Sequence, residues 1–300
     1  MIRAHPATQH GIAPAELPLA VRAMRLGFRA LRLVSRRAAA RVALHLFVRP
    51  RRHPVPARER EVLARGERSD VRVGERRIAA WTWQPSGGPT RGTAYLVHGW
   101  EGRGGQLSAF ADPLVAEGFR VVAFDHVGHG ESDGVRCSLP TMRDTLAAVV
   151  EATLGEGEDA PAAVVAHSMG SFAATLLFAR GWRATRVAYL APPDDLLVYF
   201  SRYLELATGS ADLLPDLIDL LERRYGERVG DFEFHGLVER LGQPLLVLHS
   251  TDDRDVPIEG GRFVASHWPG ARIVELEGLG HRRILRSSEA VRRAVEFLAE

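Results

Sequence analysis

Six short apolar segments alternate with segments of helical periodicity along most of this 300-residue chain. They are TAYLVHG (93–99), FRVVAFD (119–125), AAVVAH (162–167), RVAYLAPP (186–193), PLLVLHS (244–250) and ARIVELEG (271–278). Runs this short and this apolar are typical of strands buried on both faces of a sheet, and the segments between them have the length of crossover helices. The alternation predicts an α/β fold with a mostly parallel central sheet covered by helices on both faces.

Helices are expected where apolar residues recur every three or four positions. Such recurrence covers residues 106–117, 140–154, 170–180, 258–267 and 287–299. Before the first apolar run, VRVGERRIAAWTW (71–83) alternates in part around a central glycine, which predicts an antiparallel hairpin.

One connection, residues 194–240, is far longer than a crossover needs. It contains two amphipathic segments, LLVYFSRYLEL and LLPDLIDLLERRYG. We therefore predict a small helical cap inserted at 194–240 into a core formed by residues 61–193 and 241–300. Residues 1–60 are predicted to form a basic amphipathic extension and linker.

Charge is distributed unevenly between these parts. Residues 1–60 hold thirteen arginines and only two acids, whereas the rest of the chain holds 26 arginines and 35 acids. Every basic residue is arginine, which reflects compositional bias, so we expect no nucleic-acid partner. No apolar run approaches the roughly 18 residues of a membrane span, and the single cysteine, Cys137, excludes an intrachain disulfide. These features predict a cytoplasmic protein and leave its oligomeric state open.

The extension carries a regular arginine pattern. Its spacing of three and four residues places Arg22, Arg25, Arg29, Arg32 and Arg36 on one side of a helix. Met24, Gly27, Leu31 and Val34 fall on the other side. Two interpretations follow. The helix lies on the predicted core, with its arginines in water or paired to the acidic remainder of the chain, or residues 20–48 make peripheral contact with an anionic membrane at its inner face.

Ser168 lies in VVAHSMGSFAA (164–174), where an apolar strand meets a helix of small residues. Ala166 and Gly170 let neighbouring backbone pack closely at this turn. The arrangement predicts a nucleophile elbow, which exposes a serine Oγ at the carboxyl edge of a sheet. The alternative is a hydroxyl that merely caps the helix.

A nucleophilic serine needs a base, and the base needs an acid to orient it. TDDRDVP follows one later strand and carries Asp252, Asp253 and Asp255, while LGHRRIL follows the next and carries His281. The carboxyl ends of parallel strands share one edge of a sheet, so these groups are expected to meet Ser168 there.

From about residue 70 to 300 the chain resembles the α/β-hydrolases. The resemblance rests on HGW (98–100), FDHVGHGESDG (124–134), AHSMG (166–170), TDDRDVP (251–257) and GLGHRRIL (278–285), which stand in the family's order. Ala166 replaces the first glycine of the usual elbow, a bulky tryptophan follows His-Gly, and the basic extension is additional.

The resemblance implies a triad of Ser168, Asp253 and His281, with the backbone N–H groups of Trp100 and Met169 as oxyanion hole. Asp194 and Asp195, which follow the preceding strand, are rivals for the acid, and His267 is a weaker rival for the base. His98, His126, His129 and His167 crowd nearby loops without the spacing of a metal site, so no metal or other cofactor is expected.

We therefore expect a serine hydrolase that cleaves a carboxylic ester with a small or single-chain acyl group. Thioesterase, peptidase and C–C hydrolase activities use the same groups and remain alternatives. A non-enzymatic ligand-binding or partner-binding module is a further alternative, because a fold does not fix a function.

Overall fold

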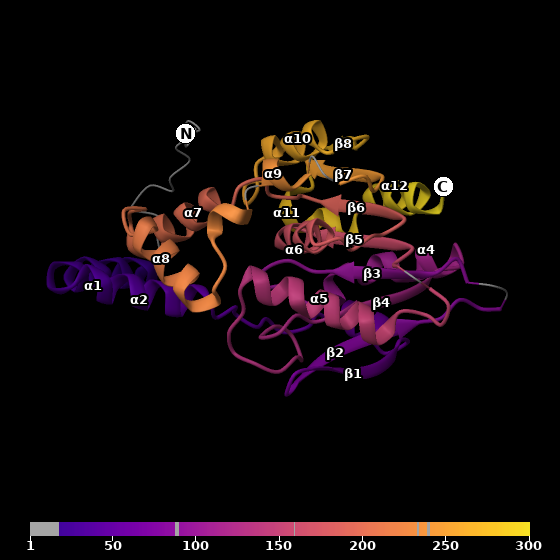
Figure 1. Ribbon diagram of the computed structural model, residues 1–300, viewed down its shortest axis with the longest axis horizontal. Coiled ribbons are helices and arrows are strands. Elements are labelled where there is room, and N and C mark those ends of the chain that lie inside the picture. Colours follow the sequence, from indigo (N-terminus) through magenta and orange to yellow (C-terminus); the bar gives the residue numbers. More distant parts are fainter. Residues whose placement is uncertain (1–17, 88–89, 159, 233, 239–240) are drawn as a thin grey trace. The chain divides into compact units, whose positions relative to one another are not determined.

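The computed structural model describes residues 18–300, except 88–89, 159, 233 and 239–240 (Figure 1). The predicted extension therefore lies outside the described residues over 1–17. The chain divides into two compact units. One comprises the described part of Met1–Phe47 with Leu197–Gly226, and the other comprises Val48–Leu196 with Glu227–Glu300.

The larger unit is built on an eight-stranded sheet in the order β1-β2-β4-β3-β5-β6-β7-β8. All six predicted strands are present, and the hairpin supplies the other two. The bounds are β1 Glu67–Val73, β2 Arg76–Trp83, β3 Thr93–Val97, β4 Arg120–Phe124, β5 Ala163–His167, β6 Arg186–Leu190, β7 Leu245–Ser250 and β8 Arg272–Leu276. The pairs β1–β2 and β2–β4 are antiparallel, and the remaining pairs are parallel.

Helices cover both faces of this sheet, as the sequence predicts (Figure 1). The helices are α3 Ala57–Leu63, α4 Ala111–Ala116, α5 Leu139–Thr153, α6 Met169–Ala179, α9 Phe234–Val238, α10 Ile258–His267, α11 Gly280–Arg283 and α12 Ser288–Ala299, with 3₁₀ turns η2 Gly104–Phe110, η3 Val229–Phe232 and η4 Ile284–Arg286. Alternate strand residues face opposite layers. Leu96 joins the core with Leu114 of α4 and Val291 of α12, whereas the Tyr95 hydroxyl lies 3.1 Å from Thr153 of α5.

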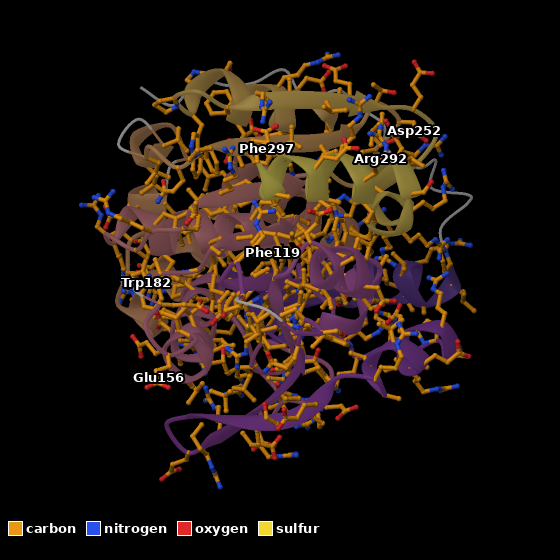
Figure 2. All side chains as sticks on the ribbon, turned by 90° about the vertical axis from the view of Figure 1, so that its right-hand side faces the viewer. Phe119, Glu156, Trp182, Asp252, Arg292 and Phe297 are labelled. Carbon is orange, nitrogen blue, oxygen red and sulfur yellow. The ribbon has the colours of Figure 1, made fainter. Side chains whose placement is uncertain are left out.

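The last helix, α12, has one side buried in the core and the other exposed to solvent. Figure 2 labels Arg292 and Phe297, both on α12. Phe297 is 4% exposed and belongs to the core, with the guanidinium of Arg272 4.5 Å above its ring. Arg292 lies on the solvent face and forms ion pairs of 2.7 Å with Glu289 and Glu296. The helix therefore buries only the apolar stripe that its periodicity predicts.

Within its described residues, the smaller unit holds the helices α1 Leu19–Val34, α2 Arg36–Phe47, α7 Leu196–Thr208 (from Leu197 onward) and α8 Leu214–Tyr225. The amino-terminal extension thus folds together with helices of the predicted insertion. Phe47 ends α2 and packs edge-on against Phe200 and Tyr203 of α7, at 5.2 and 4.8 Å between ring centres. The Tyr203 hydroxyl donates a 2.8 Å hydrogen bond to Ala43 O.

Other parts of the predicted extension and insertion belong to the larger unit. Helix α9, within 194–240, packs on α6, with Phe234 and Phe172 5.4 Å apart. Glu59 of α3, within 1–60, forms a buried bidentate ion pair with Arg103 at 2.6 and 3.0 Å.

Among the helices that the structure describes, none has the length and apolar character needed to cross a membrane.

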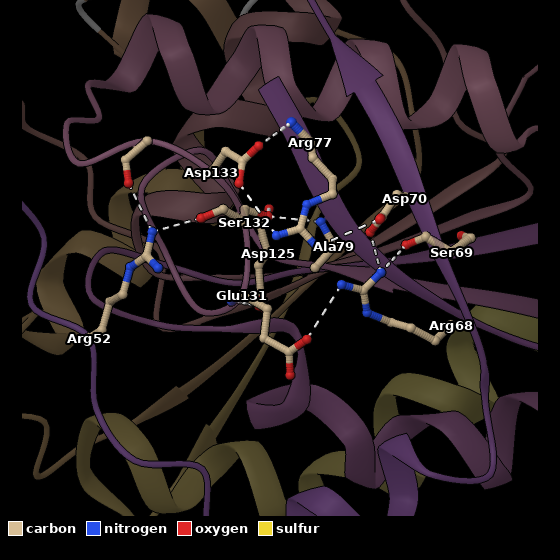
Figure 3. A network of polar contacts seen from close by, with 11 residues as sticks. Arg52, Arg68, Ser69, Asp70, Arg77, Ala79, Asp125, Glu131, Ser132 and Asp133 are labelled. Carbon is tan, nitrogen blue, oxygen red and sulfur yellow. Dashed lines mark hydrogen bonds and ion pairs between the residues drawn. The ribbon is translucent and has the colours of Figure 1, made fainter. Parts of the chain in front are cut away.

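The loop after β4, residues 125–134, is fastened to β2 (Figure 3). The Ser132 hydroxyl donates to Asp125 O at 2.6 Å and accepts from Ala79 N at 3.0 Å. Asp133 accepts from Arg77 N at 2.9 Å. The Asp125 carboxylate accepts from Gly104 N and Glu131 N, both at 2.7 Å, although burial raises its pKa to about 6. These bonds fix a loop whose histidines lie beside the carboxyl end of β3.

We expect Ser132→Ala to lower the free energy of unfolding by about 1–3 kcal/mol, because it leaves a buried N–H and a buried carbonyl without their partner. Urea denaturation measures the change. Ser288→Ala, at an exposed position, is the control and should stay within about 0.5 kcal/mol of the unsubstituted protein. Equal stability of the two variants would contradict the role given to Ser132.

Candidate functional site

Ser168 occupies the turn between β5 and α6 in a strained conformation. Its φ of 51° and ψ of −125° lie outside the regions that residues with a side chain normally adopt. Neighbouring structure holds the turn, because Ser168 N donates to Leu190 O at 2.9 Å. The side chain makes no capping hydrogen bond to α6. The position thus has the strain expected of a nucleophile elbow, and its hydroxyl does not cap the helix.

Two glycines allow the loop after β3 to press against this turn. A Cβ placed on Gly170 would lie 2.5 Å from His98 O, and one placed on Gly99 would lie 3.0 Å from both His167 O and Ser168 Cβ. The same point on Gly99 is 3.4 Å from Met169 N. Trp100, the predicted second oxyanion donor, follows Gly99 directly. The structure therefore places Gly99, the residue before Trp100, beside the amino end of α6, where the first N–H groups have no acceptor within the helix.

His281 and Asp253 meet at the carboxyl ends of the last two strands. The Nδ1 atom of His281 lies 2.8 Å from Oδ2 of Asp253, whose side chain is fully buried. Because a carboxylate only accepts, Nδ1 carries the proton and Nε2 is left as the basic nitrogen. The other oxygen, Oδ1, accepts from Asp255 N and Val256 N, both at 2.9 Å.

These contacts keep Asp253 ionised. Burial by itself raises the pKa of a carboxyl group, but hydrogen bonds from histidine and from the Val256 N–H outweigh it and hold the pKa of Asp253 well below its usual range. His281 provides the histidine bond, because His249 is 3.6 Å away and its Nε2 instead donates to Val256 O at 3.0 Å. The pair can therefore hold a fixed imidazole tautomer beside a permanent negative charge.

His167 links this pair to the serine turn. It immediately precedes Ser168, and its Nε2 donates a 3.0 Å hydrogen bond to His281 O. The two imidazole rings lie 4.6 Å apart between centres. Burial lowers the pKa of His167 well below its usual value, so the ring is neutral. This contact brings His281 next to the strained turn at Ser168, and it was not predicted from the sequence.

A second contact that was not predicted from the sequence supports the loop before His281. The Ser250 hydroxyl accepts from Leu279 N and Gly280 N at 3.1 and 3.0 Å, and donates to Asp252 at 2.5 Å. Asp252 in turn accepts from Gly280 N at 3.0 Å. Polar residues at the end of the apolar run PLLVLHS are the signal that could have identified this support.

The rival residues lie in other arrangements. Asp252 is exposed and supports a loop, as just described, while Asp255 is exposed and donates its N–H to Asp253. Asp194 and Asp195 follow β6, but the Nδ1 bond of His281 goes to Asp253. His267 ends α10, stacks on Phe263 at 4.0 Å and has its Nδ1 2.9 Å from Phe263 O.

His98, His126 and His129 cluster between the loops after β3 and β4. His98 Nε2 accepts from His126 N at 2.9 Å, and its Nδ1 donates to Gly99 O at 2.7 Å. His129 Nε2 accepts from Glu101 N at 3.2 Å. Burial lowers the pKa of all three rings, so they are neutral. Within the described ranges, no group of three His, Cys, Asp or Glu side chains is arranged to hold a metal ion.

A cavity of about 510 Å³ opens in the larger unit among α3, η2 and η4. Glu101, which follows Trp100, and Arg282, which follows His281, both line it. Arg103 at its wall is paired with Glu59, and Glu101 is paired with Arg51 at 3.0 Å. The cavity is therefore rich in arginine and adjoins the loops that carry the predicted oxyanion donor and base.

Family profiles match two stretches of the chain. The profile described as serine aminopeptidase, S33, matches residues 88–216, and that described as TAP-like protein matches residues 233–300. Among curated proteins, a monoacylglycerol lipase of Mycolicibacterium smegmatis is 34% identical over 237 residues, which is 67% of this chain and 83% of the relative.

Solved structures show the same fold. A putative lipase from Acinetobacter baumannii superposes with a TM-score of 0.60 at 19% identity, covering 80% of this chain and 93% of that one. The monoacylglycerol lipase of Paleococcus ferrophilus superposes with a TM-score of 0.56 at 24% identity, covering 74% of this chain and 98% of that one.

We expect Asp253→Asn to lower kcat for hydrolysis of a chromogenic acyl ester by about 10³–10⁴-fold, because an amide does not hold His281 in the tautomer with Nε2 unprotonated. Steady-state kinetics measures the loss. Asp255→Asn, an exposed carboxylate of the same loop, is the matched control and should keep kcat within a few-fold. A mild effect of Asp253→Asn together with a crippling effect of Asp195→Asn would transfer the acid role to Asp195.

Proposed function

Because the chain belongs to the α/β-hydrolase superfamily and is a hydrolase similar to monoacylglycerol lipase, we propose that it cleaves carboxylic esters through an acyl-enzyme on Ser168. The observation that carries this proposal is the His281–Asp253 bond of 2.8 Å. His167 ties that pair to the strained turn that holds the serine. In this proposal Ser168 as nucleophile, His281 as base and Asp253 as orienting acid form one catalytic triad.

The proposed reaction begins at Ser168. His281 Nε2 takes the Ser168 proton as Oγ attacks the ester carbonyl, and the ionised Asp253 stabilises the imidazolium that forms. His281 then gives the proton to the leaving alcohol, which departs and leaves the acyl group on Ser168. A water molecule, deprotonated by the same histidine, attacks this acyl-enzyme, releases the acid and restores the serine.

The negative oxygen of each tetrahedral intermediate needs donors that are in place beforehand. The N–H groups of Met169 and Trp100 fit this role, since Met169 opens α6 and Gly99 brings the neighbouring loop within contact of it. The amino end of α6 adds a favourable dipole for a negative charge. Only the backbone of Trp100 and Met169 is used in this step.

The proposed substrate is an ester of a single acyl chain or a small acid. The name of the Mycolicibacterium relative, monoacylglycerol lipase, supports this class. A thioester or a peptide bond could be cleaved by the same groups, and one matching profile is described as serine aminopeptidase. Ester and amide substrates differ in the leaving group, so direct comparison of rates separates them.

We expect a fluorophosphonate probe to label the protein at Ser168 and Ser168→Ala to abolish both labelling and turnover, because the substitution removes the nucleophilic oxygen. Intact-protein mass spectrometry measures the labelling. The matched control is Ser266→Ala, which removes an exposed hydroxyl and should leave both unchanged.

Chromogenic esters with acyl chains of two to sixteen carbons, an acyl thioester and an aminoacyl anilide complete the experiment. The proposal requires the esters to give the highest kcat/KM. A folded protein that is neither labelled nor active on any of these substrates would overturn it in favour of a binding module. Higher kcat/KM on the thioester or the anilide would keep the nucleophile and reject the ester class.

A further inference from the structure

Helix α1 exposes a row of leucines. Leu19, Leu26 and Leu33 are 79%, 67% and 91% exposed, and Val34 is 84% exposed. The leucines are seven residues apart, so they lie along one side of the helix. An exposed leucine is unremarkable by itself, whereas an aligned row on one helix indicates a contact surface.

This leucine row is not the face by which α1 packs in its own unit. Phe28 is 4% exposed, and Met24 and Leu31 are half-buried. At 100° per residue these three residues lie roughly opposite Leu26. The helix therefore has two apolar sides, of which one packs against neighbouring helices and the other faces solvent.

The arginines of the extension divide in the same way. Arg25 donates to Glu205 O and Leu206 O of α7 at 2.7 and 3.1 Å. Arg32 pairs with Asp212, and Arg36 pairs with Asp216 at 2.7 Å. Three of the five arginines that the sequence places in one stripe thus contact other helices of the smaller unit.

The other two arginines border the leucine row. Arg22 and Arg29 are exposed, and within the described part of the chain neither is paired with a carboxylate. On helix α2, Arg37 and Arg41 are also exposed, and among the described residues neither is paired with a carboxylate. Residues 17–58 contain no aspartate or glutamate. The exposed side of α1 therefore combines apolar side chains with unneutralised positive charge.

We propose that α1 docks this protein on an anionic lipid surface, with Leu19, Leu26 and Leu33 inserted among the acyl chains and Arg22 and Arg29 at the phosphates. An apolar row bordered by arginines is the pattern by which a helix lies in the plane of a charged bilayer. Charge selects this occupant, because an apolar protein groove would leave the bordering arginines without partners. Docking is independent of the proposed esterase activity.

Co-sedimentation of the full-length protein with vesicles tests the proposal. Vesicles of phosphatidylcholine alone and of phosphatidylcholine with 30% phosphatidylglycerol are compared at low and at high salt. We expect sedimentation with the anionic vesicles at low salt, and much less with neutral vesicles or at high salt, because salt screens the arginine contribution.

Two variants separate the apolar and the charged contributions. The triple variant Leu19→Ser, Leu26→Ser, Leu33→Ser should reduce the partition coefficient at least tenfold. Arg22→Gln with Arg29→Gln should reduce it about tenfold or more at low salt, and by much less at high salt. Val135→Ser and Arg183→Gln change an exposed valine and an exposed arginine of the other unit, and neither should change the coefficient.

A fluorescent label reports insertion directly. The only cysteine, Cys137, is buried and 1% exposed, so an environment-sensitive dye reacts selectively with Leu26→Cys. We expect enhanced, blue-shifted emission with anionic vesicles from a dye at Leu26→Cys, and no change from a dye at Val135→Cys. Thermal melts of each variant establish that it is folded.

Several outcomes would overturn the proposal. They are an unsubstituted protein that stays in the supernatant, folded leucine variants that bind as well as the unsubstituted protein, and binding that appears only after removal of residues 2–17. Gel filtration adds another outcome, since a dimer that dissociates on substituting the leucines would assign the row to contact between two copies. Serine labelling is measured in parallel, so loss of docking and loss of catalysis are distinguishable.

Discussion

The architecture depends on the close packing of strand ends at the carboxyl edge of the sheet. Non-glycine residues with positive φ are Glu101, Ser168 and Ala191 among those described. They follow β3, β5 and β6, which are neighbours in the sheet. Such conformations cost free energy and persist only where the surroundings hold them. Here the parallel strands supply that constraint, since Ser168 N and Ala191 N both donate to carbonyl groups of the next strand.

Polar side chains at the same edge of the sheet hold the loop that carries His281. Ser250, at the end of β7, and the exposed Asp252 hold the loop that precedes the histidine. His167, at the end of β5, holds its carbonyl. None of these side chains needs to touch a substrate, yet together they restrict where the imidazole can lie. Precise placement of a proton-transfer group is worth several orders of magnitude in rate.

The smaller unit is held together by different interactions. Its contacts are aromatic packing around Phe47 and arginine contacts with the helices of the insertion. These contacts bury one apolar side of α1 and neutralise some of its arginines. A second apolar side remains exposed to solvent. An aligned apolar row that stays in solvent is the feature on which the docking proposal rests.

Local sequence patterns are enough to predict the strands, the helices that cover the sheet and the set of candidate residues. Strand periodicity is a local property, and the order of Ser168, Asp253 and His281 along the chain follows the strands that carry them. The folded chain was needed to show which carboxylate meets His281, that His167 bonds a carbonyl 114 positions away, and that α9 joins the larger unit while α7 and α8 join the extension. It also decided which side of α1 is packed. The pattern of α1 carries apolar residues on two sides, so its periodicity could not select between them. In the folded chain, Phe28 is buried on one side, and Arg25, Arg32 and Arg36 pair with groups far along the sequence.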